Sequence, residues 1–465
     1  MHCRIGAPWP VIALNPAGLL IMTDLPRQIR LAAGDYFMHG QDYRMRRAGL
    51  PGNVCRVVVR LEKGLDVDRL RQQVAASPIL DGLARARIVR PFLQFTPKWR
   101  IAPRNGSVFQ EHNAEAVADG PGSLPGSVLG REMHPGRGPA LALDLVHCAD
   151  GTKDLVLSWN HVLMDARGAE LIWRHLSATG AARGCPGIND LINPAQRKRW
   201  SVTECWHNMK QAHGSVEWLR ESGGEPLFSL MPAERRNGEC RGRQRMIAFN
   251  ESETARIEAH CEFLNAGFRR SHFYLACSLK SLHLVASARG NKEGAYLIPV
   301  PHDMRKRGAN GPIFSNHLSI LFYRIEPRFA GSLGAIMGEL NRQMTDQIRT
   351  RFPECCMAAL ELFKPIPLWY YGRHLGQPTR GKFASFCFSD SGETCTGIRE
   401  FMGGRIREVT HLVPTWRPPG LTVLFWSFSG RLHVLLAWVE DCLEAAEVEQ
   451  LEQGLRSALL DEKMS

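Results

Sequence analysis

The chain has 465 residues, of which 44% are hydrophobic, so it can bury substantial cores in two or three average domains or in two large lobes. Its formal charge of +12 and pI of about 9.2 favour anionic partners. The short basic clusters lack interleaved aromatic residues and a Cys/His framework, which argues against a nucleic-acid-binding module.

The cysteine content and the N-terminus bear on where the protein works. Thirteen cysteines occur without a CxxC pair or a zinc-binding spacing, which favours reduced thiols in the cytoplasm and no metal site. No apolar run approaches the length of a membrane span, so we expect no transmembrane segment and at most peripheral membrane contact. Residues 1–24 form an extension that need not belong to the fold, because Met22 offers a second start and no export signal precedes it.

The first half of the chain predicts strands and helices in alternation. A β-branched run from Cys55 leads through a glycine turn to a helix with apolar residues three and four apart in 67–75. Two apolar runs in 139–161 are joined by an Asp-Gly turn, which predicts a hairpin whose second strand ends at His161. A helix is expected to follow in 166–180.

The second half repeats this pattern after a connecting region. Residues 245–265 predict a strand, an Asn/Ser cap and a helix, 271–290 a buried helix and 295–308 a strand followed by a turn. The chain closes with a hairpin that turns at Ser429-Gly430 and an amphipathic helix over 443–459.

These elements predict an α+β fold of two α/β two-layer sandwiches. The expected divisions are an N-terminal lobe over 25–185, a connecting region over 186–244 with one helical patch, and a C-terminal lobe over 245–465.

The stretch WNHVLMDARG (159–168) places His161 and Asp165 on either side of the turn between the predicted strand and helix. A histidine there is suited to take a proton from a hydroxyl or amine. The aspartate could orient the ring or pair with an arginine to brace the turn. The alternative is a core histidine beside a helix-capping aspartate. Walker A, HExxH, GxSxG and complete GxGxxG motifs do not occur, which argues against phosphoryl transfer, zinc hydrolysis and serine hydrolysis.

The same stretch resembles the HHxxxDG signature of the CoA-dependent acyltransferase superfamily. This superfamily includes the condensation domains of peptide synthetases, wax ester synthase/diacylglycerol acyltransferases, alcohol acetyltransferases and chloramphenicol acetyltransferase. Other segments are similar to its opening segment, its second-lobe strand pair, its bridge element and its terminal hairpin: LAAGDYFMHGQD (31–42), LIPVPHDMRKRG (297–308), FSDSGE (388–393) and LFWSFSGRLHVLL (424–436).

The resemblance implies two chloramphenicol-acetyltransferase-like lobes with an active-site tunnel between them. It makes His161 the general base, Asp165 the structural aspartate and Arg305 its partner, with phosphate or surface contact as the alternative for Arg305. Ser389 would stabilise the oxyanion, with a turn residue as the alternative, and Asn316 would support the strand ends. No cofactor is expected to be bound. The co-substrate is an acyl-CoA or acyl carrier protein thioester, and the acceptor is a small molecule with an alcohol or amine group.

Three departures from the family pattern leave a second hypothesis open. The first histidine of the signature is Asn160, a structural position; the glycine after the aspartate is Ala166, with Gly168 following; and the bridge asparagine is Asp390, which adds negative charge near the tunnel. The leading hypothesis is an O- or N-acyltransferase. The alternative is a non-catalytic relative that acts as an interaction or scaffolding protein. The two hypotheses differ in whether His161 faces an open tunnel or one plugged by Trp159 or Trp173.

Overall fold

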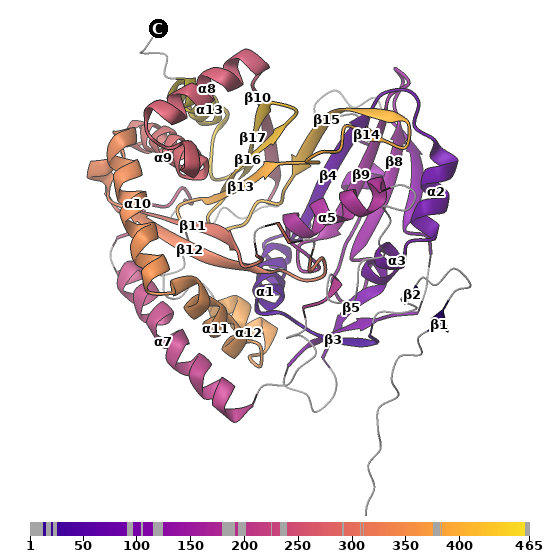
Figure 1. The fold of residues 1–465 in the computed structure, drawn as a ribbon. Coiled ribbons are helices and arrows are strands. Elements are labelled where there is room, and N and C mark those ends of the chain that lie inside the picture. The colour runs from indigo at the N-terminus through magenta and orange to yellow at the C-terminus, as the bar shows by residue number, and fades with distance from the viewer. Residues whose placement is uncertain are drawn as a thin grey trace, which may run out of the picture.

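The computed structural model describes residues 26–460 except 91–95, 104–105, 115–123, 179–190, 194–200, 225, 233–239, 291–292, 307, 310, 375–381 and 383, together with two short strands, β1 (Ala13–Leu14) and β2 (Leu20–Ile21). The rest of the expected extension, 1–24, lies outside the described residues. Two lobes of mixed helices and sheets lie side by side (Figure 1), which confirms the α+β, two-lobed fold class.

A six-stranded sheet forms the centre of the first lobe, in the order β14-β15-β4-β9-β8-β7. The bounds of its strands are Val54–Leu61 (β4), Phe109–Asn113 (β7), Leu141–His147 (β8), Lys153–Asn160 (β9), Glu400–Phe401 (β14) and Gly404–Leu412 (β15). The predicted hairpin is confirmed as β8 and β9, which pair antiparallel from Leu141↔Trp159 to His147↔Lys153.

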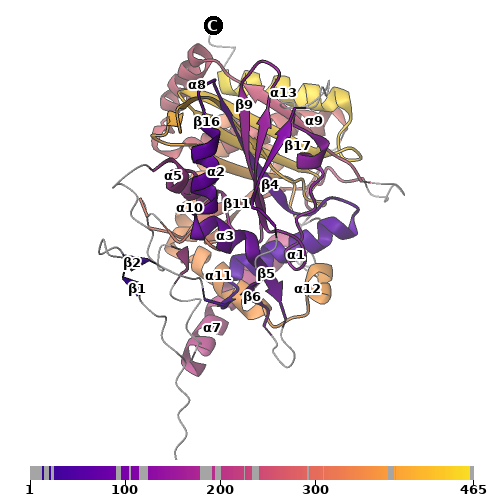
Figure 2. The same cartoon turned by 90° about the vertical axis from the view of Figure 1, so that its right-hand side faces the viewer.

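Helices of the first lobe cover one face of this sheet. Strand side chains from β4, β8 and β9 share one core with apolar residues of four helices: α1 (Ala33–Arg47), α2 (Val67–Ala75), α3 (Pro78–Arg85) and α5 (Ala166–Ser177). Figure 2 shows α2, α3 and α5 on the same side of β4 and β9. A short helix, α4 (Gly126–Leu129), packs against the opposite face, and a small sheet joins β3 (Gln28–Arg30), β6 (Lys98–Ile101) and β5 (Ala86–Val89).

The second lobe has a four-stranded sheet and a separate strand pair. The sheet is ordered β10-β17-β16-β13, with bounds Gly242–Ala248 (β10), Cys387–Glu393 (β13), Leu421–Phe428 (β16) and Arg431–Val439 (β17). The pair is β11 (Tyr296–Asp303) with β12 (Leu318–Ile325). This lobe's strands share a core with α8 (Glu251–Phe263), α9 (Arg270–Ala288) and α13 (Ala445–Leu460), and with apolar side chains of the helix over 333–349.

The remaining helices are α7 (Val202–Gly224), α10 (Leu333–Arg349), α11 (Phe352–Phe363) and α12 (Leu368–His374), with two 3₁₀ turns, η3 (Gly267–Arg269) and η4 (Pro327–Phe329). Of these helices, α12 packs against α1, and the others lie near the strand pair. α7 falls within the expected connecting region, 186–244. Its Ala212 packs against Ala358 and Ala359 of α11.

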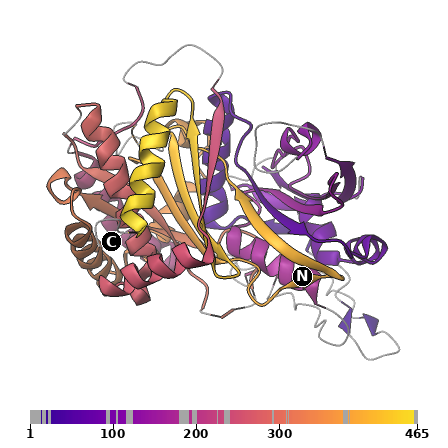
Figure 3. The ribbon, with the colours of Figure 1, turned by 90° about the horizontal axis from the view of Figure 1, so that it is seen from above.

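The sheets also show how the lobes are joined. β15 pairs with β4 of the first lobe from Ile406↔Leu61 to Leu412↔Arg56, although it lies within the expected C-terminal range, 245–465. Figure 3 shows this ribbon crossing to the N-terminal sheet. The boundaries of the lobes expected from the sequence stay a prediction. The strand pairing shows in addition that β14 and β15, in 400–412, belong to the sheet of the first lobe. Within the described residues, no helix is both long enough and apolar enough to cross a bilayer.

Candidate active site

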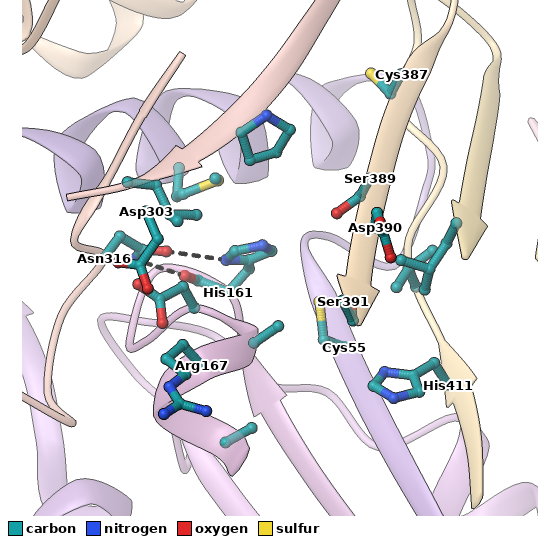
Figure 4. A pocket seen from close by; sticks show the side chains of 18 of the residues that line it. Cys55, His161, Arg167, Asp303, Asn316, Cys387, Ser389, Asp390, Ser391 and His411 are labelled. Carbon is teal, nitrogen blue, oxygen red and sulfur yellow. Dashed lines mark hydrogen bonds between the residues drawn. The ribbon is translucent and has the colours of Figure 1, made fainter. Parts of the chain in front are cut away.

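A cavity of about 370 Å³ lies where the two lobes meet. On the side of the first lobe its walls come from β4, β9, β15 and α5. On the side of the second lobe they come from β11, β12, β13 and β16. His161, Asp165, Asn316 and Ser389 all line it, so the fold brings together residues that are far apart in the sequence. Figure 4 shows His161, Asn316 and Ser389 around this cavity. Trp159 and Trp173 are part of its wall and are 2% and 1% exposed.

Asn160 ends β9 and fixes the backbone just before His161. Its side-chain amide donates to Asp42 Oδ1 (3.0 Å) and to the carbonyl of Met133 (2.8 Å), and its carbonyl oxygen accepts from the amide of Val162 (3.0 Å). Every polar atom of this fully buried side chain is therefore paired. Asn160, itself uncharged, holds the strand end through these hydrogen bonds, as expected for a structural position.

The imidazole of His161 projects into the cavity toward Ser389 (Figure 4). Its Nδ1 lies 3.1 Å from Oδ1 of Asn316. The amide of Asn316 cannot be reversed without loss, because its nitrogen donates to Asp35 Oδ1 (3.1 Å) and to the carbonyls of His161 (2.8 Å) and Val162 (3.1 Å). Oδ1 of Asn316 is thus an acceptor, so Nδ1 of His161 carries the proton and Nε2 keeps its lone pair.

The protonation state of His161 suits a base. Burial lowers the pKa of His161 below its usual value. A hydrogen bond to its own backbone, the charge of Asp165, the hydrogen bond to Asn316 and one to the backbone of Met164 oppose that shift. The ring is therefore neutral at neutral pH and able to accept a proton at Nε2.

Asp165 caps α5 and forms the predicted ion pair with Arg305. Its two carboxylate oxygens each lie 3.0 Å from a guanidinium nitrogen of Arg305, and they also accept from the amides of Gly168 and His317 (both 2.9 Å). The side chains of Arg305 and Asp165 are 3% and 1% exposed, which excludes the alternative of a surface contact for Arg305.

Burial raises the pKa of Asp165 more than any other single effect. The charge and hydrogen bonds of Arg305 together with the two backbone amides outweigh burial and hold the pKa of Asp165 below its usual value. Among the described residues no hydrogen bond joins Asp165 to the His161 ring, so Asp165 acts on the ring only through its charge. Asn316, which the sequence placed at a strand end, is the residue that orients the ring.

A second carboxylate lies behind Asn316 and was missed from the sequence. Asp35 of α1 is fully buried and accepts from the backbone amide of Asn316 (2.7 Å), from its side chain and from Trp99 Nε1 (3.0 Å). Burial raises the pKa of Asp35 to about 6, although these hydrogen bonds lower it. Asp35 lies in the segment that resembles the family's opening, but nothing in that segment indicates a contact 281 residues away.

Ser389 and Asp390 occupy successive positions in β13. Ser389 lines the cavity and its hydroxyl points toward His161 (Figure 4), so it is available to an atom held between them. Oδ1 of Asp390 instead accepts from the amide of Gly392 (3.0 Å), and its carboxylate also bonds to Ser271 of α9. Burial raises the pKa of Asp390, while the hydrogen bonds from Gly392 and Ser271 oppose that shift.

Two glycines allow the backbone to close around the site. A Cβ on Gly34 would lie 2.8 Å from the carbonyl oxygen of Asn316, and a Cβ on Gly168 would lie 2.6 Å from that of Ile313. Both approaches are too close for any side chain. Gly168, two residues after Ala166, therefore provides the close approach of α5 to the second lobe.

Comparisons with known proteins give the fold its context. No family model matches the chain, and no curated protein matches it in sequence. Among solved structures, a trichothecene 15-O-acetyltransferase, TRI3 from Fusarium sporotrichioides, is similar with a TM-score of 0.66 at 12% identity, covering 93% of this chain and 95% of that one.

Two further structures extend the comparison. The condensation domain of the monacolin K polyketide synthase MokA has a TM-score of 0.65 at 12% identity over 95% of this chain and 99% of that one. SgcC5 from Streptomyces globisporus has a TM-score of 0.62 at 15% identity over 93% and 98%. The chain therefore has the same two-lobed fold as these structures, which include an O-acetyltransferase and a condensation domain.

Proposed function

We propose that the protein transfers an acyl group from a thioester to an alcohol or amine acceptor, with Nε2 of His161 as the general base. The observation that carries this proposal is the hydrogen bond between His161 Nδ1 and Asn316 Oδ1 (3.1 Å), which directs the free lone pair into a cavity shared by both lobes. The names of the similar structures, an O-acetyltransferase and a condensation domain, support acyl transfer as the reaction class.

The proposed reaction begins with proton transfer to His161. Nε2 takes the proton of the acceptor O–H or N–H as the acceptor oxygen or nitrogen bonds to the thioester carbonyl carbon. General-base catalysis of this kind contributes about 10²–10⁴-fold in rate. The charge of Asp165 and the carbonyl of Asn316 stabilise the imidazolium that forms.

The tetrahedral intermediate carries a negative oxygen that needs a hydrogen-bond donor. We assign this role to the Ser389 hydroxyl, which faces His161 across the cavity. Collapse of the intermediate breaks the carbon–sulfur bond, and the departing thiolate takes the proton from the imidazolium. Acylated acceptor and free thiol leave, and the neutral base is regenerated.

The donor is proposed to be an acyl-CoA or an acyl carrier protein. A net charge of +12 is favourable for the pyrophosphate of CoA and for an acidic carrier surface. The scaffolding alternative is less well supported, because the hydrogen bonds of Asn160, the close packing of Gly168 and the partners of Asp390 accommodate each departure from the family pattern.

The test is release of free thiol from a panel of acyl-CoAs, short to long, with mixed alcohol and amine acceptors. The wild type is compared with His161→Ala and with His302→Ala, a partly exposed histidine on β11 that does not line the cavity. We expect thiol release in the wild type and in His302→Ala and its loss in His161→Ala. If none of the three folded proteins released thiol from acyl-CoAs or from carrier-protein donors, the result would favour the scaffolding role.

A further inference from the structure

A second histidine enters the same cavity from the other side. His411 lies on β15, and Figure 4 shows its ring projecting from that strand beside Cys55 and Ser391. His411 lines the cavity together with His161, and it is only 6% exposed. The catalytic scheme above gives it no role.

The ring of His411 is held in one orientation. Its Nε2 lies 2.9 Å from Oγ1 of Thr394, and its ring contacts that of Trp426 in a tilted arrangement, with centroids 5.1 Å apart and planes at 49°. Trp426 stacks in turn on His433 at 5.3 Å and 10°. Burial, and to a smaller extent His433, lowers the pKa of His411 to about 3, so the ring is neutral.

The hydrogen bond to Thr394 decides which ring nitrogen carries the proton. Thr394 is 5% exposed, and in the described part of the chain its hydroxyl has no acceptor other than His411 Nε2. If the hydroxyl donates to Nε2, no buried O–H is left without a partner. Nδ1 of His411 then carries the proton, and it too has no partner among the described residues, so it is free to donate to a ligand.

The wall between the two histidines is largely apolar. The sheet pairs His411 with Val57 of β4, and Val57 with Leu157 of β9, four residues before His161. The Cα atoms of His411 and His161 are thus two strand spacings apart across the sheet and four residues apart along it, a separation of roughly 16 Å. Cys55, Val57 and Trp159 line the cavity in between.

We propose that His411 Nδ1 is a specificity subsite that donates a hydrogen bond to a neutral oxygen of the substrate, on the far side of an apolar spacer from the reacting atom. The inference rests on the proposed function for the identity of the reacting end. It names the substrate class as oxygenated at both ends, such as a hydroxylated, keto or ether-bearing chain or ring system, in place of a plain hydrocarbon chain.

Binding of straight-chain α,ω-diols, from octanediol to tetradecanediol, against the 1-alkanol of equal length tests this subsite. Quenching of tryptophan fluorescence reports binding, because Trp159, Trp173 and Trp416 line the cavity. We expect at least one diol to bind the wild type about three- to tenfold more tightly than its alkanol, the value of one neutral hydrogen bond.

Three variants make the test specific. His411→Phe keeps a ring on Trp426 and removes the donor, so the diol preference should disappear. His411→Gln retains a donor and should keep part of the preference, and Thr394→Val, which releases the ring, should weaken it. Circular dichroism checks that each variant is folded.

A diol preference that is absent from the wild type at every length, or equal in the wild type and folded His411→Phe, overturns the proposal. The binding measurement uses no thioester and needs no turnover. A diol preference without acyl transfer would leave the subsite standing and remove the proposed function, whereas acyl transfer without the preference would do the reverse.

Discussion

Replacing Asp165 by asparagine should destabilise the protein far more than the same change at Asp303. Both carboxylates lie 3.0 Å from the guanidinium of Arg305, but the Asp165 side chain is 1% exposed and that of Asp303 is 42% exposed. At an effective dielectric constant of about 20, two unit charges about 4 Å apart attract by about 4 kcal/mol, and breaking a buried pair costs about 3–5 kcal/mol. An exposed pair contributes only about 0–1 kcal/mol.

The hydrogen bonds of Asp165 increase the expected difference in stability between Asp165→Asn and Asp303→Asn. All four bonds to the Asp165 carboxylate come from donors: Arg305, Gly168 and His317. The NH₂ group of an asparagine would face one of these donors whichever way it turned. We therefore expect Asp165→Asn to lower the free energy of unfolding by about 3–5 kcal/mol and Asp303→Asn by less than about 1 kcal/mol. Urea unfolding followed by tryptophan fluorescence measures both. Equal losses in the two variants would refute the reasoning.

Three further results are expected at the site. Ser389→Ala should lower the rate of acyl transfer by about 10²–10³-fold if its hydroxyl binds the oxyanion. Ser391→Ala, a change in the same strand and cavity wall, should have little effect on that rate. Equal rates for the two variants would contradict the role assigned to Ser389. Gly34→Ala should reduce activity at least tenfold, because the added methyl group would lie 2.8 Å from the backbone oxygen of Asn316, which orients His161. Gly338→Ala, on an open helix face, should leave activity unchanged in the same assay. Because burial lowers the pKa of His161, activity should rise with pH through an apparent pKa below 6.5 and then stay level. A pH–rate profile in which activity rises through an apparent pKa above 6.5 would count against a neutral, buried base.

Local sequence signals were sufficient for most of the elements around the site. The turn at Ser429-Gly430 is confirmed, with φ of 54° and 74°, the left-handed pair that a two-residue hairpin requires. Asn250 caps α8 as expected, accepting from the amide of Glu253 at 2.8 Å. These features depend on neighbouring residues, which is why the sequence pattern could indicate them.

Contacts between distant segments could not be read in this way. Asn316 orients His161 across 155 residues, and Asp35 holds Asn316 across 281. A side-chain hydrogen bond of this kind leaves no periodicity or spacing in the sequence. The resemblance to a known family indicated Asn316, but only as support for strand ends, and it indicated neither Asp35 nor His411.

The pairing of β15 was also beyond the sequence pattern. Residues 404–412 alternate like any half-buried strand, and nothing in that alternation says which sheet the strand joins. The structure pairs it with β4, and this pairing places His411 in the cavity.

The most direct test of the account is whether acyl transfer depends on the Nε2 lone pair of His161. With a donor and an acceptor identified from the panel, acylated acceptor and free thiol are quantified together in the wild type, His161→Ala and His302→Ala. The account predicts one acylated acceptor per thiol in the wild type and in His302→Ala, with the rate about 10²–10⁴-fold lower in His161→Ala. Equal rates of acceptor acylation in wild type and folded His161→Ala would contradict it.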